Sequence, residues 1–371
     1  MTINITTNTD VTANPQKQEP TAGAEPVFTE TMQHADVKLS KVLFTRGGSE
    51  ILLLGKGRGR CLALWERDDG IDPFRVLATK NTDIDPNDAC KLPENRVCIG
   101  YADGSLAIFN TDKEDLVLMS RIPPVHNGCA SRAICRHGNG VLSASSNGTL
   151  SAVDVETGTS RTVFSGQAGI RSICTTFGNN VVMAGDSNGQ ITIWDLRENP
   201  EAMTKIPDPI KTLIPSKKAL DPVTALTSHP AQSNLVCLGT DDGVVGLIDA
   251  RNIRGANITS TYLVAKKGIT QVQFHPTCSD NLLVSASDGS LVRIDASAAP
   301  IAVGTRSTKD TVWLEGDLIN SLRSESIRYD GIYPISSFDI HSDTVVATSS
   351  IGMVSLYQQL PFFPHSNFGR F

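Results

Sequence analysis

Residues 181–197 read VVMAGDSNGQITIWDLR, and this stretch decides the fold. Val181 to Gly185 is a run of small and β-branched residues, and Gln190 to Trp194 alternates polar and apolar residues as a half-buried strand does. Asn188-Gly189 lies between the two runs and favours a type I′ hairpin turn, which needs positive φ at both central positions. The stretch therefore predicts a strand, a two-residue turn and a second strand that ends at Trp194-Asp195.

The same unit recurs along the chain, each time with a glycine at the turn. The seven turn glycines are Gly59, Gly104, Gly148, Gly189, Gly243, Gly289 and Gly352. Most of the intervals between them are 41 to 46 residues long. A period near 40 to 45 residues with several short strands per unit is typical of WD-repeat β-propellers. One unit cannot bury both faces of its small sheet, so seven units predict an all-β, seven-bladed propeller.

Composition limits the classes of function that fit the chain. The 371 residues carry a net charge of −6, which does not favour nucleic acid or an anionic membrane as the main partner. No apolar run is long enough to span a bilayer, so no membrane insertion is expected, and the polar N-terminus does not read as a secretory signal. Eight cysteines fall singly, mostly inside strand-like runs, which indicates reduced thiols in a nuclear or cytosolic chain.

The repeat divides the chain into three parts. Residues 1–26 are polar and rich in Thr and Pro, and we expect a disordered extension. Val27 to Met32 alternates like a strand and is expected to close the ring by pairing into the last blade, so the propeller runs over residues 27–358. The tail, residues 359–371, carries four phenylalanines, which either pack against the propeller or anchor a partner.

Two insertions interrupt the repeat, at residues 198–221 and 297–333. The first is a Pro-broken loop. In the second, the apolar residues are spaced to form one face of a short helix before the last blade. That helix either covers a strand edge of its own propeller or docks a partner. The candidate partner-binding residues are Val312, Trp313, Leu314, Leu318 and Ile319, with Phe362 and Phe363 from the tail; Leu322 completes the helix face.

The sequence lacks the residue patterns of an active site. No two histidines have metal-ligand spacing, and His229-Pro230 and His275-Pro276 recur at one place in the repeat, as turn residues do. Gly55 to Arg60 is rich in glycine, but a strand follows it where a phosphate loop needs a helix. We therefore predict no catalytic, cofactor, metal or small-molecule site, and a protein that is not an enzyme.

Two Asp-x-Arg sequences follow strands in consecutive blades, Asp195-Leu196-Arg197 and Asp249-Ala250-Arg251. They resemble the box of propellers that act as substrate receptors of cullin-type ubiquitin ligases. This resemblance implies an adaptor contact through Arg197 and Arg251. The alternative is structural, with Asp ending the strand by bonding to local N–H groups and Arg at the surface.

The general resemblance to WD-repeat propellers covers about residues 27–358. Only Trp194-Asp195 is a literal WD pair, and the Gly-His pair of that family is absent. We therefore expect the blades to lack the buried Asp–His–Ser/Thr–Trp network of the family and to depend on apolar packing.

A closer resemblance is carried by residues 223–295, by the Val312-Trp313-Leu314 insert and by Ser336-Ser337-Phe338-Asp339. These stretches are similar to the small WD-repeat nucleoporins of the Y-shaped outer-ring complex of the nuclear pore. The resemblance implies a non-catalytic scaffold subunit in the short arm of that complex. Such a subunit binds other nucleoporins through propeller loops and the 297–333 insert, and supports pore assembly and the transport of mRNA and protein. It implies location at the nuclear envelope and, as in some relatives, at kinetochores in mitosis.

Overall fold

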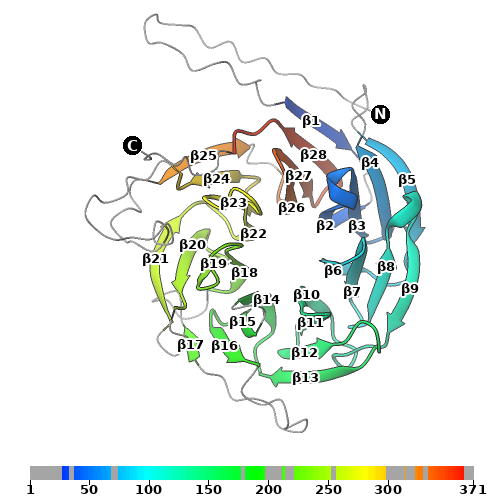
Figure 1. The fold of residues 1–371 in the computed structure, drawn as a ribbon, viewed down its shortest axis with the longest axis horizontal. Coiled ribbons are helices and arrows are strands. Elements are labelled where there is room, and N and C mark those ends of the chain that lie inside the picture. Colours follow the sequence, from blue (N-terminus) through cyan, green and yellow to red (C-terminus); the bar gives the residue numbers. More distant parts are fainter. Residues whose placement is uncertain are drawn as a thin grey trace, which may run out of the picture.

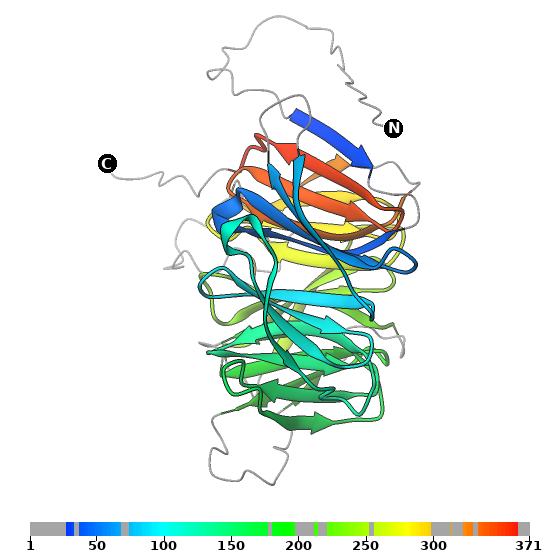
Figure 2. The ribbon, with the colours of Figure 1, turned by 90° about the vertical axis from the view of Figure 1, so that its right-hand side faces the viewer.

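The computed structural model describes residues 27–32, 37–67, 74–176, 180–196, 211–213, 221–251, 256–297, 313, 322–328 and 333–362. These residues form seven four-stranded antiparallel sheets arranged as blades around a central axis (Figure 1). Seen edge-on, the ring has its turns and connections on two opposite faces (Figure 2). The seven-bladed all-β propeller predicted from the repeat is therefore confirmed.

In blades one to six the strands run in sequence order from the centre of the ring to its rim. Blade one contains β2 (Lys38–Thr45), β3 (Glu50–Lys56), β4 (Cys61–Arg67) and β5 (Phe74–Asn81). Blade two contains β6 (Pro86–Leu92), β7 (Arg96–Tyr101), β8 (Leu106–Asn110) and β9 (Val117–Ile122). Blade three contains β10 (Ser131–His137), β11 (Gly140–Ser145), β12 (Thr149–Val153) and β13 (Ser160–Ser165). Blade four contains β14 (Ile170–Thr176), β15 (Val181–Asp186), β16 (Ile191–Asp195) and β17 (Lys211–Leu213). Blade five contains β18 (Val223–Ser228), β19 (Leu235–Thr240), β20 (Val244–Asp249) and β21 (Asn257–Leu263). Blade six contains β22 (Ile269–Phe274), β23 (Asn281–Ala286), β24 (Leu291–Asp295) and β25 (Arg323–Arg328). Blade seven contains β26 (Ile335–His341), β27 (Thr344–Ser349) and β28 (Met353–Gln358), and β1 (Val27–Met32) is its outermost strand. Two 3₁₀ turns, η1 (Arg46–Gly48) and η2 (Asp112–Glu114), lie in blades one and two.

The ring closes through the first and last strands of the propeller. β1 lies antiparallel to β28, from Val27 opposite Gln358 to Met32 opposite Met353 (Figure 1). This pairing confirms the closing strand expected from residues 27–32. It gives blade seven its fourth strand and covers an edge of β28 that would otherwise expose unpaired backbone groups.

The two insertions of the repeat contribute strands as well as loops. β17 pairs with β16 from within residues 198–221, and β25 pairs with β24 from within residues 297–333. Both are the outermost strands of their blades. The longer repeat intervals therefore arise from long connections to the last strand of blades four and six. The helix predicted before blade seven lies outside the described residues, apart from Trp313 and Leu322.

Apolar clusters hold neighbouring blades together. In the described part of the chain, each of the seven blade interfaces contains one cluster of buried side chains. Trp194 is 1% exposed and packs against Phe164 of blade three, with ring centroids 4.7 Å apart. Because a fully buried large apolar side chain stabilises a fold by roughly 1.5–3 kcal/mol, these interfaces supply most of the driving force for assembling the ring.

The hairpin turns differ from the type I′ turn expected at Asn188-Gly189. Gly189 N donates to Asp186 O at 3.3 Å, and Asp186 N donates to Gln190 O at 2.9 Å. Gly189 has a φ of 75°, whereas Asn188 does not have positive φ. The loop is thus a type I turn followed by a left-handed glycine, which forms a bulge and needs only one positive φ. In blade one the left-handed glycine is Gly57, with φ 90°, and not the expected Gly59.

Each innermost strand carries a β-bulge at its second or third residue, where one extra residue interrupts the pairing with the next strand. The seven extra residues are Ser40, Asn87, Arg132, Arg171, Thr224, Thr270 and Ser336. We call them the bulge ring. They all line the central channel, at the end where the inner strands begin.

Blade three contains a buried polar network that the sequence did not lead us to expect. His126, which is 1% exposed, lies 2.8 Å from Ser143 Oγ through Nε2 and 2.6 Å from Thr149 Oγ1 through Nδ1. Ser143 in turn bonds to Ser131 at 2.7 Å. The expectation of purely apolar blades is wrong here, although it fits blade four, where Trp194 Nε1 has no hydrogen-bond partner among the described residues.

Deleting residues 1–32 should destabilise the protein, because blade seven loses β1 and the β28 edge opens. We expect a melting temperature lower by several degrees, or about 2–4 °C for each kcal/mol lost, measured by circular dichroism. Deletion of residues 1–26 is the matched control, because it retains β1. Equal melting temperatures for the two truncated proteins would contradict a closing role for β1.

The stability of blade three should depend on pH through His126. Burial lowers the pKa of His126 to about 4, so between pH 6.5 and 4 the unfolded chain binds a proton that the folded chain does not. The contribution of His126 is complete above pH 6.5 and is lost as the pH falls, and the full shift is worth about 3 kcal/mol. Urea unfolding at pH 7 and pH 4.5 should show a smaller loss for His126→Gln than for the native protein. His137→Gln, in the same blade, is the control. The same loss in the native protein and in His126→Gln would exclude His126 as the titrating group.

Candidate functional site

The innermost strands of the seven blades surround a central channel. It encloses a cavity of about 530 Å³, lined by the innermost strands of all seven blades. Its walls carry hydroxyl, amide and charged side chains as well as apolar ones. What these side chains contact decides whether the channel holds the propeller together or offers groups to a ligand.

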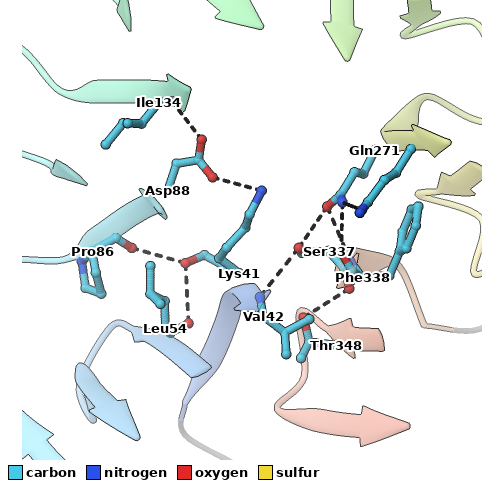
Figure 3. Close-up of polar contacts among 12 residues, drawn as sticks. Lys41, Val42, Leu54, Pro86, Asp88, Ile134, Gln271, Ser337, Phe338 and Thr348 are labelled. Carbon is cyan, nitrogen blue, oxygen red and sulfur yellow. Dashed lines mark hydrogen bonds and ion pairs between the residues drawn. The ribbon is translucent and has the colours of Figure 1, made fainter. Parts of the chain in front are cut away.

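One polar chain joins blades one, two and three across the channel wall. Lys41 Nζ lies 3.0 Å from Asp88 Oδ1, while Asp88 Oδ2 accepts a hydrogen bond from Ile134 N at 2.9 Å (Figure 3). Ser40 Oγ bonds to Pro86 O at 3.1 Å. Burial opposes the charge on Lys41, but the Asp88 carboxylate outweighs it and raises the lysine pKa above its ordinary value.

A second polar chain joins blades six, seven and one. Gln271 Nε2 donates to Phe338 O at 2.7 Å, and Ser337 Oγ donates to Gln271 Oε1 at 2.8 Å (Figure 3). Ser337 Oγ also accepts from Val42 N at 3.5 Å. These bonds join neighbouring inner strands, so we assign them to the integrity of the ring rather than to a ligand.

The two thiols that line the channel are not activated as nucleophiles. Cys90 and Cys135 line it, and burial raises the pKa of both thiols well above the ordinary value. A protonated thiol is a poor nucleophile. Among the described residues, no three His, Cys, Asp or Glu side chains lie together as metal ligands would. In the same residues, no helix has both the length and the apolar character needed to cross a bilayer.

The two recurrent histidines, His229 and His275, connect neighbouring blades. His275 Nδ1 accepts from Cys278 N at 2.8 Å, and its Nε2 lies 2.7 Å from Ser342 O in blade seven. His229 Nε2 lies 3.2 Å from Ser279 O in blade six. Both histidines lie in turns, as expected from the repeat, and each also contacts a backbone carbonyl of the next blade.

Trp313, a candidate partner-binding residue, is a core residue. It is 1% exposed and packs edge-to-face on Phe274, with ring centroids 5.4 Å apart. Leu322 packs on the same cluster, which lies between blades five and six. At Trp313 and Leu322, the insert thus packs against its own propeller. The Trp313 ring is not exposed to a partner. The other candidates from the insert, Val312, Leu314, Leu318 and Ile319, lie outside the described residues.

The start of the aromatic tail also packs against the propeller. The Phe362 ring lies 4.5 Å from the His275 ring and 5.4 Å from the Arg293 guanidinium. Arg293 is 4% exposed, and its charge is met by Asn281 at 2.8 Å and by Asp295 at 3.1 Å. Phe362 therefore covers a buried charged group of blade six. Phe363 lies outside the described residues.

Of the two Asp-x-Arg arginines, only Arg251 lies within the described residues. Its guanidinium lies 2.5 Å from Asp249, which also accepts from Arg251 N at 3.0 Å. This is the local strand-ending bond of the structural alternative. Arg197 is not described, so the adaptor contact through Arg197 and Arg251 stays a prediction.

Comparison with known families decides the membership of the chain. The family described as nucleolar protein 10-like, N-terminal domain, a β-propeller, has a model that matches residues 119–323, more than half of the chain. The chain belongs to this family. The family model begins inside blade two and ends at the first residue of β25 in blade six.

Individual relatives match shorter parts of the chain. Nucleoporin Nup43 of Mus musculus and of Homo sapiens is 29% identical over 116 residues, which is 31% of this chain and 28% of the nucleoporin. The periodic tryptophan protein 1 homolog of Drosophila melanogaster is 26% identical over 112 residues, 30% of this chain and 22% of that protein. An uncharacterized WD repeat-containing protein of Schizosaccharomyces pombe, C63.06, is 24% identical over 186 residues, 47% of this chain and 53% of that protein. The matched part of this chain thus spans about half or less of each relative.

Solved structures support the fold alone. The WD40 β-propeller domain of Doa1 has a TM-score of 0.65 at 15% identity, covering 89% of this chain and 96% of that domain. Raptor of Chaetomium thermophilum has a TM-score of 0.64 at 14% identity, covering 86% of this chain and 28% of that protein.

Trp313→Ala should destabilise the propeller by about 3–5 kcal/mol, because it leaves a cavity between blades five and six. Urea unfolding followed by fluorescence or circular dichroism measures the loss. Leu263→Ala, at a side chain that is 75% exposed, is the control and should change the unfolding free energy little. A Trp313→Ala protein as stable as the control would mean that the indole is not a core residue.

Proposed function

We propose that this chain is a non-catalytic scaffold subunit of the nuclear pore outer ring, which binds other nucleoporins at the nuclear envelope. The observation that carries the proposal is the 29% identity to nucleoporin Nup43 over 116 residues. A rigid propeller suits this role, because it offers loops on two faces and strands on its rim while its core stays fixed. In this role the chain supports pore assembly and the transport of mRNA and protein.

The rim offers a surface for such a partner. Large apolar side chains are exposed on the outermost strands of blades one and two: Val76 (57%) on β5, with Val117 (48%), Leu118 (47%) and Met119 (56%) on β9. β5 and β9 are neighbours on the rim of the ring (Figure 1). We call these four residues the rim patch. A contiguous exposed apolar patch is typical of a contact site for another protein, and we propose that these four residues form one.

A second candidate is a scaffold of a nucleolar assembly. It is favoured by the family model, whose description names a nucleolar protein and which covers a larger share of this chain than the nucleoporin alignment does. Both candidates share the propeller as a protein-binding scaffold and differ in the assembly that contains it.

Affinity purification of the tagged full chain from its own cells, with mass spectrometry, separates the candidates. We expect outer-ring nucleoporins in near-equal amounts, and fluorescence of the tagged chain at the nuclear rim. Nucleolar proteins with nucleolar fluorescence would replace the first candidate by the second. A cullin with its adaptor would contradict both and favour the contact through Arg197 and Arg251.

The rim patch is tested in the same purification. Leu118→Asp with Met119→Asp places two charges on β9 and should remove most of the recovered partners, while the circular dichroism spectrum stays native. Leu263→Asp, at an exposed residue of β21, is the control and should leave recovery unchanged. Full recovery with the β9 variant would locate the contact elsewhere on the propeller.

A further inference from the structure

The bulge ring places two arginines at one end of the central channel. Five of its seven members are neutral side chains, and the other two are Arg132 on β10 and Arg171 on β14. β10 and β14 are the inner strands of adjacent blades and lie side by side next to the channel (Figure 1). The positive charge of the ring is therefore concentrated on one side of the mouth.

These two arginines lack a carboxylate partner such as the two channel lysines, Lys41 and Lys91, have. Lys41 lies 3.0 Å from Asp88, and Lys91 lies 2.5 Å from Asp339. Within the described ranges, no carboxylate lies within 4.0 Å of the guanidinium of Arg132 or Arg171, and both side chains are exposed. The mouth thus has a local positive charge in a chain whose net charge is −6.

Two neighbouring features bear on this charge. Lys56, at the end of β3, has a pKa lowered first by burial and then by the charge of Arg132, against a smaller opposite effect of Asp88 and Asp85, so a third cation lies near Arg132. The turns between second and third strands carry aspartates, such as Asp186 and Asp288. Asp186 Oδ1 accepts from Asn188 N and Gln190 N, and Asp288 Oδ1 accepts from Ser290 N. These carboxylates serve their own turns and do not pair with the two arginines.

Three of the five neutral members of the bulge ring use their hydroxyl groups in bonds within the propeller. Ser40 Oγ bonds to Pro86 O, Thr224 Oγ1 to Gly239 O, and Thr270 Oγ1 to Ser285 Oγ. A small anion needs several donors that converge on one point. Two arginines from different blades suit carboxylates spaced along an extended chain better. A guanidinium also binds a carboxylate with two parallel hydrogen bonds.

We propose that the channel mouth binds an acidic peptide segment of a partner protein, with Arg132 and Arg171 as the carboxylate contacts. The site is separate from the rim patch. The inference rests on the chain acting as a protein-binding scaffold, and it does not depend on which assembly contains the chain.

The test uses the purified full chain and a fluorescein-labelled peptide of eight glutamates, with binding followed by fluorescence anisotropy at low salt. The native protein should bind this peptide and not a peptide of eight glutamines. Arg132→Gln with Arg171→Gln should weaken binding by about tenfold or more, because both charged contacts are lost. Arg161→Gln, at an exposed arginine on β13 of blade three, is the matched control and should leave binding unchanged.

Several results would overturn the proposal. They are no binding of the glutamate peptide by the native protein, equal binding by the double variant, or an equal loss in Arg161→Gln. Displacement of the peptide by inorganic tripolyphosphate at lower concentration than by unlabelled peptide would assign the site to a small polyanion instead. The peptide test uses only the purified chain. A negative result would therefore leave the result of the affinity purification, which tests the rim patch, unaffected.

Discussion

The Asp339 carboxylate joins four blades at the place where the ring closes. It accepts from Phe44 N of blade one at 2.7 Å and from Gln273 of blade six at 3.2 Å, and it pairs with Lys91 of blade two at 2.5 Å. The bond from Phe44 N crosses the interface of blades seven and one, which joins the two ends of the repeat, and the β1–β28 pairing completes blade seven. Each blade has two faces to bury, so an open ring would leave an apolar face of blade one and of blade seven in water. Every other interface depends on this closure.

The internal needs of the ring explain why several aromatic residues are not free for partners. Trp313 fills the interface of blades five and six, and Phe362 covers Arg293, whose buried charge would otherwise meet solvent on one side. Two sets of exposed groups are our candidate contacts with partners. Apolar side chains lie on β5 and β9 at the rim, and the arginines of the bulge ring lie at the channel mouth. A fold whose aromatic residues pack within the propeller, and which leaves a few surface groups unpaired, is suited to act as a scaffold.

Local patterns in the sequence predicted the blades and the closing strand, because glycine turns and alternating strands depend on neighbouring residues only. The turn type at Asn188-Gly189 was wrong, since the bulge that follows a type I turn is not visible in a dipeptide. β17 and β25 lie in irregular stretches without a strand pattern and exist through pairing with β16 and β24. The His126 network and the bulge ring join residues that are distant in sequence. The burial of Trp313 could not be predicted, because the sequence pattern of an apolar helix face is the same whether it packs against its own protein or against a partner.

We infer that the seven blades form one closed ring that unfolds cooperatively. Native-state hydrogen exchange tests it most directly at the amides of Phe44 and Ile134, which donate to side chains of neighbouring blades, and at Met183 in blade four. In a cooperative ring, all three amides should exchange only through global unfolding, with equal opening free energies. A markedly lower opening free energy at Phe44 than at Met183 would show that the ring opens between blades seven and one while the other blades stay folded, and would contradict the account.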